Sequence, residues 1–438
     1  MDHSPRLLGV TLSDAIRPRH FVVYLIAVFV SSGYAGALAI LQPGLLAVMA
    51  IDQQAQAVLT GYLGALQELV FILLLGTFGT LSDRIGRRPV YMFGLLVTGL
   101  GFVLYPHATN IAQLALFRLV IAIGSAAMIG MMVTVVADYA AEQSRGHANG
   151  LQGLTATLGA FIPPLLAILP KVFAGQGFDE LTAQKLTFAS AGALGVAASV
   201  LVALGLAPKL TAATQRTAKA SGNLFADMLA GLRAARDPQT ALSYGAAFIS
   251  RGDLAVTGAF ISLWLIQYGT QQLGMSPSEA MFTLAVPRTL AVVVGALVGS
   301  ILMGQIADRI SRVAAVALAS GLAAVVYGGV FMINDPTADW VMILLWAMGI
   351  AEISAFVSSQ ALVGQQAPAA QRGAVIGFFG VAGAVGILVG TSGGGLLFAH
   401  VSPSAPFVLF GLLNGVVCLW SLVLLRKPAM DGATPEGA

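Results

Sequence analysis

The stretch Gly79-Thr-Leu-Ser-Asp83-Arg84-Ile-Gly86-Arg87-Arg88 separates two long apolar segments, and a degenerate copy of it returns further along the chain. The copy reads Gly304-Gln-Ile-Ala-Asp308-Arg309-Ile-Ser311-Arg312, and its aspartate follows the first one at a spacing of 308 − 83 = 225 positions. The dipeptides Arg145-Gly146 and Arg372-Gly373 repeat at a spacing of 372 − 145 = 227. Two matches at nearly one offset predict a duplicated unit.

The composition indicates that this duplicated unit lies in a lipid bilayer. Hydrophobic residues make up 57% of the 438 residues and charged residues only 9%, against about 25% in an ordinary soluble domain. The mean hydropathy is +0.86. Too few charges are present to cover the surface of a water-soluble protein of this length, and the chain is too apolar to be disordered.

A helix needs about 20 apolar residues to cross roughly 30 Å of hydrocarbon. Breaking the sequence at polar residues, Pro and Gly predicts an all-α integral membrane protein with twelve transmembrane helices in two pseudo-symmetric six-helix halves. The basic N-terminal segment runs directly into the first span, so no cleavable signal peptide is expected. The predicted spans are 21–50, 56–81, 90–106, 111–138, 148–170, 186–207, 239–269, 280–306, 313–333, 340–364, 373–399 and 405–425.

Lys and Arg predict the orientation, because cytoplasmic loops carry an excess of them. With the N-terminus inside, only Lys171 and Lys185 of the 22 basic residues lie on the outer side and three arginines lie within spans, which leaves 22 − 5 = 17 on the cytoplasmic side. Both termini are therefore expected in the cytoplasm, with the helices in a bacterial inner membrane. This asymmetry explains the isoelectric point of 9.1 without a nucleic-acid partner.

The longest polar segment divides the chain. We expect an N-terminal six-helix half at 1–207, a cytoplasmic linker at 208–238 and a C-terminal six-helix half at 239–438. Apolar residues at helical spacing between 224 and 232 predict an amphipathic linker helix on the inner membrane surface. A solvated helix without a partner is favoured over a regulatory one.

The motif after the second of twelve spans resembles the loop signature of the major facilitator superfamily. Span count, orientation, linker and the second copy extend this resemblance over nearly the whole chain. It implies a secondary transporter whose halves rock about a solute site at the midplane. No phosphate-binding G-x-x-x-x-G-K-[ST] is present, so no ATP or other cofactor is expected. The single cysteine, Cys418, and the absence of Cys/His spacing argue against a metal site.

The two motifs are expected to form a cytoplasmic latch. Gly79 permits close helix approach and Gly86 permits a tight reversal. The resemblance implies that Asp83 binds the start of the eleventh span and Asp308 the start of the fifth, and a permanent turn-and-charge anchor is the alternative. The expected latch residues are Gly79, Asp83, Arg84, Gly86, Arg87, Arg88, Asp138, Arg145, Gly304, Asp308, Arg309, Arg312 and Arg372.

Six ionisable residues fall inside predicted spans, where each is costly and marks a pathway or site by default. Spans 3, 6, 9 and 12 carry none of them, and the resemblance implies that these four spans support the bundle from outside while the others surround the cavity. Together with one tyrosine, the six form the predicted solute and proton pathway: Tyr34, Glu68, Arg118, Arg251, Asp253, Arg288 and Glu352.

Glu68 and Glu352 are the better candidates for proton coupling, because no arginine is close to them in sequence. Burial favours the protonated form of a carboxyl group and a nearby arginine favours the ionised form. Arg251 and Asp253 are about 200° apart around a helix, so one is expected to line the cavity and the other to pair with a neighbouring helix. Mutual structural ion pairs are the alternative to titration.

We therefore expect secondary active transport of a small organic solute, with proton-coupled antiport (export) narrowly favoured. The Pro163-Pro164 pair in the fifth span loosely matches an antiporter motif of the family, whereas Arg118 lacks the glutamine and glycine that follow it in the family's drug antiporters. Proton-coupled uptake of an organic anion or zwitterion is second, and a non-transporting receptor or scaffold is third. We expect a monomer whose partners are solute, protons and lipid, and no enzyme.

Overall fold

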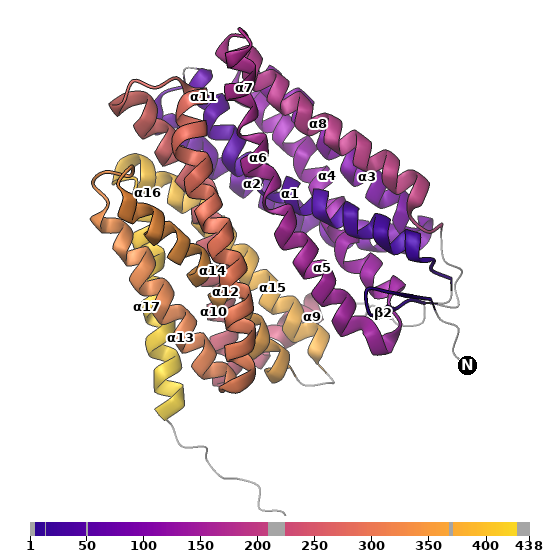
Figure 1. Ribbon diagram of the computed structural model, residues 1–438. Coiled ribbons are helices and arrows are strands. Elements are labelled where there is room, and N and C mark those ends of the chain that lie inside the picture. The colour runs from indigo at the N-terminus through magenta and orange to yellow at the C-terminus, as the bar shows by residue number, and fades with distance from the viewer. Residues whose placement is uncertain (1–4, 14, 50, 209–223, 368–370, 427–438) are drawn as a thin grey trace, which may run out of the picture. The chain divides into compact units, whose positions relative to one another are not determined.

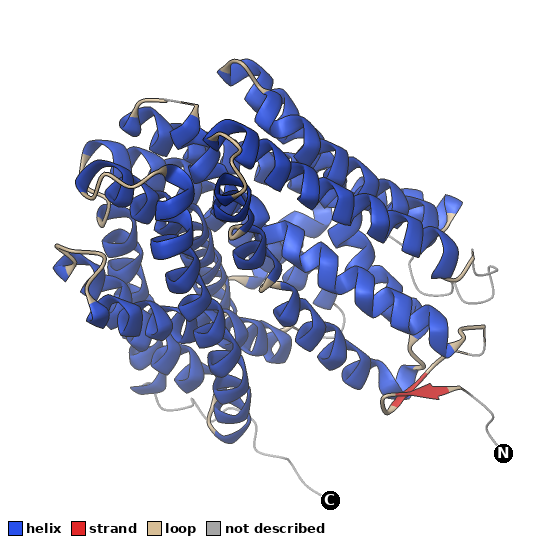
Figure 2. Cartoon of the chain, turned by 45° about the horizontal axis from the view of Figure 1, so that its top comes forward, coloured by secondary structure: helices blue, strands red, loops and turns tan. Residues whose placement is uncertain are grey.

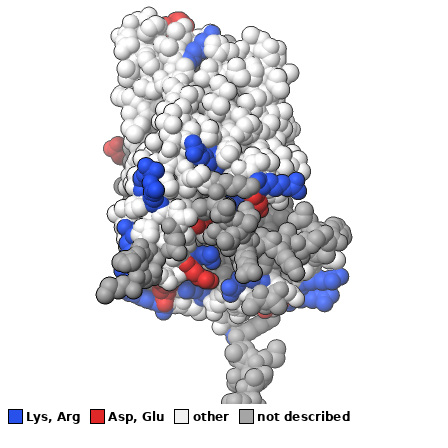
Figure 3. All heavy atoms as spheres, turned by 90° about the vertical axis from the view of Figure 1, so that its right-hand side faces the viewer, with Lys and Arg blue, Asp and Glu red and all other residues white. Residues whose placement is uncertain are grey.

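The computed structural model describes residues 5–13, 15–49, 51–208, 224–367 and 371–426, and most of these are helical (Figures 1 and 2). Twelve helices or runs of helices are long and apolar enough to cross a membrane, which confirms the predicted all-α, twelve-span architecture. In the face drawn in Figure 3, charged side chains gather mainly toward one end and leave a broad uncharged band, as a bilayer requires.

The first four spans are α1 (Pro18–Val48), α2 (Gln53–Ile85), α3 (Arg87–Leu104) with η1 (Tyr105–His107), and α4 (Ile111–Tyr139). The fifth span is a run of four short elements: η2 (Glu142–Ser144), α5 (Arg145–Gly159), α6 (Ile162–Leu166) and α7 (Leu169–Gly175). The sixth span is α8 (Glu180–Gly205). Side chains that accept backbone N–H groups start several of them, as at Asp52, Asn110 and Asp179, because the first N–H groups of a helix have no partner within it.

After the linker helix α9 (Leu224–Ala234), the second half contains α10 (Pro238–Gln272), α11 (Pro277–Ala280) with η4 (Met281–Ala285) and α12 (Val286–Arg309), α13 (Arg312–Gly329) with η5 (Val330–Met332), and α14 (Asp339–Gln366). It ends with α15 (Arg372–Leu388), η6 (Val389–Gly393) and α16 (Gly394–His400), which form one span, and with α17 (Ala405–Arg426).

Three spans are interrupted within the membrane. Pro163 and Pro164 follow the break between α5 and α6, because proline cannot donate the helical hydrogen bond and clashes with the preceding turn. In the eighth and eleventh spans, η4 and η6 are short π-helical segments, and such segments are frequent at functional sites. In the eleventh span the π-helical segment ends at Gly393, and Gly394 begins α16.

A small antiparallel hairpin precedes α1, which the sequence did not predict. Strands β1 (Arg6–Leu7) and β2 (Val10–Thr11) are joined at Leu8 and Gly9, which both have positive φ angles of 51° and 79°. The backbone N–H of Thr11 donates to Ser144 Oγ at 3.1 Å, and Leu12 pairs with Ala140. The hairpin therefore ties the N-terminal segment to the junction of α4 and α5 (Figure 1).

The chain packs into two compact units. Unit 1 contains residues 1–220, 258–290 and 391–403, and unit 2 contains residues 221–257, 291–390 and 404–438. Unit 1 thus includes one end of α10, the start of the eighth span and α16 in addition to the first six spans. The predicted halves describe the duplication and not the packing, so their boundaries stay a prediction.

Glycines let helices approach closely within each unit. In unit 1, a Cβ at Gly94 of α3 would lie 2.5 Å from the backbone N of Met128 on α4. In unit 2, a Cβ at Gly349 of α14 would overlap the carbonyl of Val292, and one at Gly295 of α12 would overlap that of Trp346. Small residues at such crossings are typical of helix packing in membranes.

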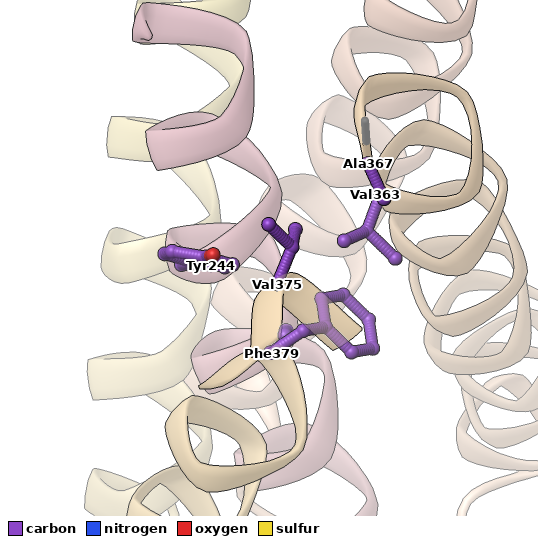
Figure 4. Packing of buried hydrophobic residues seen from close by; sticks show 6 residues of the cluster. Tyr244, Val363, Ala367, Val375 and Phe379 are labelled. Atoms are coloured by element: carbon purple, nitrogen blue, oxygen red, sulfur yellow. The ribbon is translucent and has the colours of Figure 1, made fainter. Parts of the chain in front are cut away.

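The linker helix α9 has a packing partner in its own unit, contrary to the favoured expectation of a solvated helix. A Cβ at Gly231 would lie 2.5 Å from the carbonyl oxygen of Ala374 on α15, and the Tyr244 hydroxyl donates to the carbonyl of Gly231 at 2.9 Å. Beside it, Val375 of α15 lies between Tyr244 of α10 and Val363 of α14 in a buried apolar cluster (Figure 4). Residues 209–223 of the predicted linker lie outside the described residues.

Candidate functional site

Arg118 of α4 is buried in unit 1 and is held by an amide. Its Nη1 donates to Gln42 Oε1 at 2.8 Å, and the Tyr105 hydroxyl donates to the same oxygen at 2.7 Å. Gln42 Nε2 in turn donates to Thr60 Oγ1 at 3.1 Å. We call these four residues the Gln42 cluster. It joins α1, α2, η1 and α4 through one glutamine side chain. Arg118 Nε has no hydrogen-bond partner in the described part of the chain.

Asp253 of α10 is fully buried in unit 2 and binds the twelfth span. Asn414 Nδ2 of α17 lies 3.0 Å from Asp253 Oδ1 and 2.9 Å from Oδ2, and it donates to this carboxylate. The partner of this charge is therefore a neutral amide. α17 carries no Asp, Glu, Lys, Arg or His between 406 and 425, so the charged residues alone do not reveal this contact.

Glu352 of α14 binds the ninth span. The Tyr327 hydroxyl of α13 donates to Glu352 Oε2 at 3.1 Å, and the same hydroxyl lies 2.7 Å from Thr257 Oγ1. Thr257 is one helical turn after Asp253 on α10, so both residues lie on one face of that helix. We call Asp253, Thr257, Tyr327, Glu352 and Asn414 the acid cluster. All five are less than 8% exposed.

Arg251 lies on a different side of α10. Its guanidinium carbon is 5.6 Å from the centre of the Phe356 ring on α14, within the range of a cation–π contact. A Cβ at Gly383 of α15 would overlap Arg251 Cδ, so the glycine leaves room for the arginine stem. Of the two charged residues that are two positions apart, Asp253 is thus the one that binds α17.

The remaining predicted pathway residues are placed separately. Tyr34 is buried, stacks on Phe102 at 5.1 Å between ring centres, and donates its hydroxyl proton to the carbonyl of Ala191. Arg288 of α12 is 7% exposed, and its Nη1 donates to the carbonyl of Leu284 at 3.3 Å. Glu68 lies half-buried on α2. The structure brings Asp253 and Glu352 into one cluster and places Tyr34 in helix packing.

Tyr327 and Asn414, which bind the carboxylates of the acid cluster, were not predicted from the sequence. Both lie in spans 9 and 12, which were set aside because they carry no charge. The detectable signal was an amide at 414 inside an otherwise apolar stretch. Buried polar groups require hydrogen-bond partners, so uncharged polar residues in spans must be considered together with the ionisable ones.

The first latch motif forms contacts within unit 1. Arg87 Nη1 lies 2.5 Å from Asp83 Oδ1, and Arg87 Nε donates to Asp138 Oδ2 at 2.8 Å. Gly86 has a φ of +101°, which glycine adopts readily, and the chain reverses there between α2 and α3. The expected pairing of Asp83 with the start of the eleventh span stays a prediction.

The second motif lines a cavity in unit 2. Arg312 Nη2 lies 3.3 Å from Asp308 Oδ1, and Ser311 starts α13 by accepting the N–H of Ala314. Beside them a cavity of about 720 Å³ is lined in part by Gln239 and Gln365. The pairing of Asp308 with Arg145 at the start of the fifth span likewise stays a prediction.

At the end of the spans that is outside in the predicted orientation, unit 1 joins helices from both halves of the sequence. Gln267 Nε2 of α10 donates to the carbonyl of Gln53 at 3.1 Å and to Gln56 Oε1 at 3.2 Å. Glu180 at the start of α8 accepts hydrogen bonds from both the hydroxyl and the N–H of Ser278 on α11, at 2.5 and 3.1 Å. We call these five residues the outer contacts.

The sequence of this chain, with its duplicated motif and twelve spans, matches the profile of a known family. The sequence profile of the Major Facilitator Superfamily matches residues 21–292 and 243–438. The chain belongs to this superfamily of membrane transporters, whose members are generally not enzymes.

Its relatives include Magnetosome protein MamH of Paramagnetospirillum magneticum, which is 27% identical over 381 residues that cover 83% of both proteins. Magnetosome protein MamZ of Magnetospirillum gryphiswaldense is 25% identical over 96% of this chain, and the match covers 64% of MamZ. A bacterial homologue of the human lysosomal transporter Spinster, solved inward-facing and unoccupied, is similar with a TM-score of 0.71. That match has 16% identity over 96% of this chain and all of the other, so it shows the fold alone.

The Gln42 cluster generates a stability prediction. Gln42→Leu removes the oxygen that accepts from Arg118 and Tyr105, and a hydrogen bond to a charged group contributes about 1.5–3 kcal/mol. We expect a lower melting temperature of the purified protein in detergent, and partial recovery in the double variant Gln42→Leu/Arg118→Met, which removes the unpaired charge.

The matched control for that experiment is Gln54→Leu, the same substitution at an exposed position of α2. It should melt like the wild type. A Gln42→Leu protein that also melts like the wild type would show that this cluster does not hold α1, α2 and α4 together.

Proposed function

We propose that the protein is a secondary active transporter that moves a small organic solute by alternating access and exports it in exchange for protons. The observation that carries the proposal is the environment of Asp253 and Glu352. Both carboxyl groups lie inside membrane-spanning helices, are 5% exposed or less, and are hydrogen-bonded to neutral side chains.

An ionised carboxylate in this environment is costly. Removing it from water costs several kcal/mol unless a cation compensates the charge, and Asn414 and Tyr327 supply hydrogen bonds but no charge. Proton uptake removes the cost. A rearrangement that exposes the cluster to water on one side and then the other therefore moves protons across the membrane with each cycle.

The outer contacts support alternating access. They join α2 and α8 of the first half to α10 and α11 of the second half at one end of the spans. Hydrogen bonds between side chains are weak enough to be exchanged for bonds with water, each contributing about 0.5–1.5 kcal/mol. A solute could enter from that end only after these bonds break, so they are the closed side of the proposed cycle.

The interrupted fifth span gives only weak support to export, because its Pro163-Pro164 pair matches the antiporter motif of the family loosely. Uptake of an organic anion or zwitterion by proton symport is the alternative, and a specific feature favours it. Arg118, Arg251 and Arg288 all lie within spans, and intramembrane arginines are suited to bind carboxylate or phosphate groups. For export and for uptake alike, we propose a monomer that spans a bacterial inner membrane and has both termini in the cytoplasm.

The function is tested in vesicles that enclose a pH-sensitive dye. Solutes are first selected from panels of organic anions, zwitterions and organic cations by the increase they cause in the melting temperature, because a ligand of the folded state stabilises it. We expect a gradient of a stabilising solute to move protons the opposite way in wild-type vesicles. Glu352→Gln should keep the stabilisation and lose the proton movement.

The other results of this experiment separate the alternatives. Protons that move in the same direction as the solute identify symport. A stabilising solute that crosses the membrane without any proton movement contradicts proton coupling. A solute that stabilises the protein and never crosses identifies a receptor or scaffold.

The latch generates a separate prediction. Asp83→Asn removes the charge that binds Arg87 and is proposed to bind the start of the eleventh span, so the balance between inward- and outward-facing states changes. We expect reduced transport with normal membrane insertion. Asp52→Asn makes the same change at the other end of α2 and should transport normally. Wild-type rates for Asp83→Asn would count against the latch.

A further inference from the structure

The acid cluster contains two carboxyl groups, and a short chain of hydroxyls leads from one of them toward the helix face that carries the other. Glu352 Oε2 accepts from Tyr327, Tyr327 contacts Thr257 Oγ1, and Thr257 is one turn from Asp253 on α10. Because the Tyr327 hydroxyl contacts both Glu352 Oε2 and Thr257 Oγ1, and Thr257 shares a face of α10 with Asp253, the two carboxyl groups lie in one small buried cluster. Two like charges at close range in a low dielectric cannot both be ionised without a large cost, so the pair is expected to hold at least one proton.

Among the described residues, the groups that face this pair come from α10 itself and from three neighbouring spans. The ninth span contributes Tyr327, the tenth Glu352 itself, and the twelfth Asn414, which is not ionisable. The charged group on α10 is Arg251, and its guanidinium lies over Phe356 and against Gly383 of α15. Arg251 and Asp253 are about 200° apart around the helix, so the two side chains leave α10 on different sides, although Arg251 reaches Phe356, one turn after Glu352 on α14.

We propose that Asp253 and Glu352 form one shared proton site, with the hydroxyls of Tyr327 and Thr257 leading from Glu352 toward the face of α10 that carries Asp253, and with Arg251 on a different side of that helix. This inference rests on the proposed proton-coupled transport. It adds that the two carboxyl groups act as a pair and not as two independent proton acceptors. Coupling then acts through movement of α10, with the proton on the side of α13 and α17.

The hydrogen bonds of Tyr327 and Thr257 can point in either of two directions. Neither hydroxyl gains or loses a proton when the direction changes. When Glu352 is ionised, Tyr327 donates to Glu352 and Thr257 donates to Tyr327. When Glu352 carries the shared proton, its O–H donates to Tyr327, Tyr327 donates to Thr257, and Thr257 donates to Met348 Sδ, which lies 3.6 Å away. The two directions stabilise the ionised and the protonated carboxyl in turn, so Tyr327 and Thr257 are positioning residues.

The test needs no knowledge of the solute, because its probe is the proton. Infrared difference spectra of the reconstituted full-length protein are recorded against pH, and the C=O stretching band of protonated carboxyl groups is followed. We expect Asp253→Asn and Glu352→Gln each to remove part of this band and to shift the titration midpoint of the carboxyl that remains. Tyr327→Phe should change the frequency of the Glu352 band, because its hydrogen bond is lost.

Two controls separate a shared site from a general loss of structure. Asp339→Asn changes an exposed carboxyl on the same helix as Glu352 and should leave the buried band unchanged. Arg251→Lys keeps the charge but disturbs a different side of α10, and it should also leave the titration unchanged. An Arg251→Lys shift as large as that of Asp253→Asn would overturn the pairing of Asp253 with Glu352.

The wild type alone also decides the proposal if a variant fails to fold. Two interacting carboxyl groups titrate in two separated steps that belong to the pair, and a single step for two independent groups would overturn a shared site. Persistent proton-driven transport with no titration at Asp253 and Glu352 would refute this inference and leave the proposed function standing. If neither proton-driven transport nor titration of these two carboxyl groups is observed, the proposed function is refuted as well.

Discussion

The cost of placing polar groups in hydrocarbon governs this structure. A charged side chain inside a membrane-spanning helix must find a partner within the bundle, because neither water nor a distant counter-ion compensates it there. Two clusters in the described helices meet this requirement with neutral partners. Arg118 is held by the amide of Gln42 in unit 1, and the carboxyl groups of Asp253 and Glu352 are held by neutral donors in unit 2.

The Gln42 cluster and the acid cluster differ in the charge states that they allow. A guanidinium is always protonated, so the Gln42 cluster has one charge state. A carboxyl group with neutral partners can lose or gain its charge, so the acid cluster has two states that differ in hydrogen bonding. Only the second cluster is suited to link proton movement to a change of helix packing, which is why the proposed coupling is assigned to unit 2.

The fold was predictable because it depends on features that the sequence states directly. The duplicated motif and twelve apolar stretches were sufficient for the architecture, since a bilayer allows few alternatives to spanning helices. The hairpin at β1 and β2 was missed because it depends on contacts with the distant α4–α5 junction. The partner of α9 was missed for the same reason: Gly231 approaches α15, which is far away in the sequence.

The site was predictable only in part. The ionisable residues were found because their presence in spans is conspicuous, but their partners depend on the rotation of each helix about its axis. That rotation is decided by close crossings such as Gly383 with Arg251, which sequence periodicity does not resolve. Tyr327 and Asn414 therefore became visible only when α13 and α17 were seen to pack on α10.

The most direct test of the account measures the outer ends of the spans against pH. Cys418 is replaced by alanine, and spin labels are attached at positions 55 on α2 and 271 on α10, both exposed. Labels at 55 and 109 within the first half serve as the reference pair. The account predicts two distances for 55 and 271 whose proportions change with pH, constant proportions in Asp253→Asn/Glu352→Gln, and an unchanged reference pair. A single distance for 55 and 271 at every pH would contradict it.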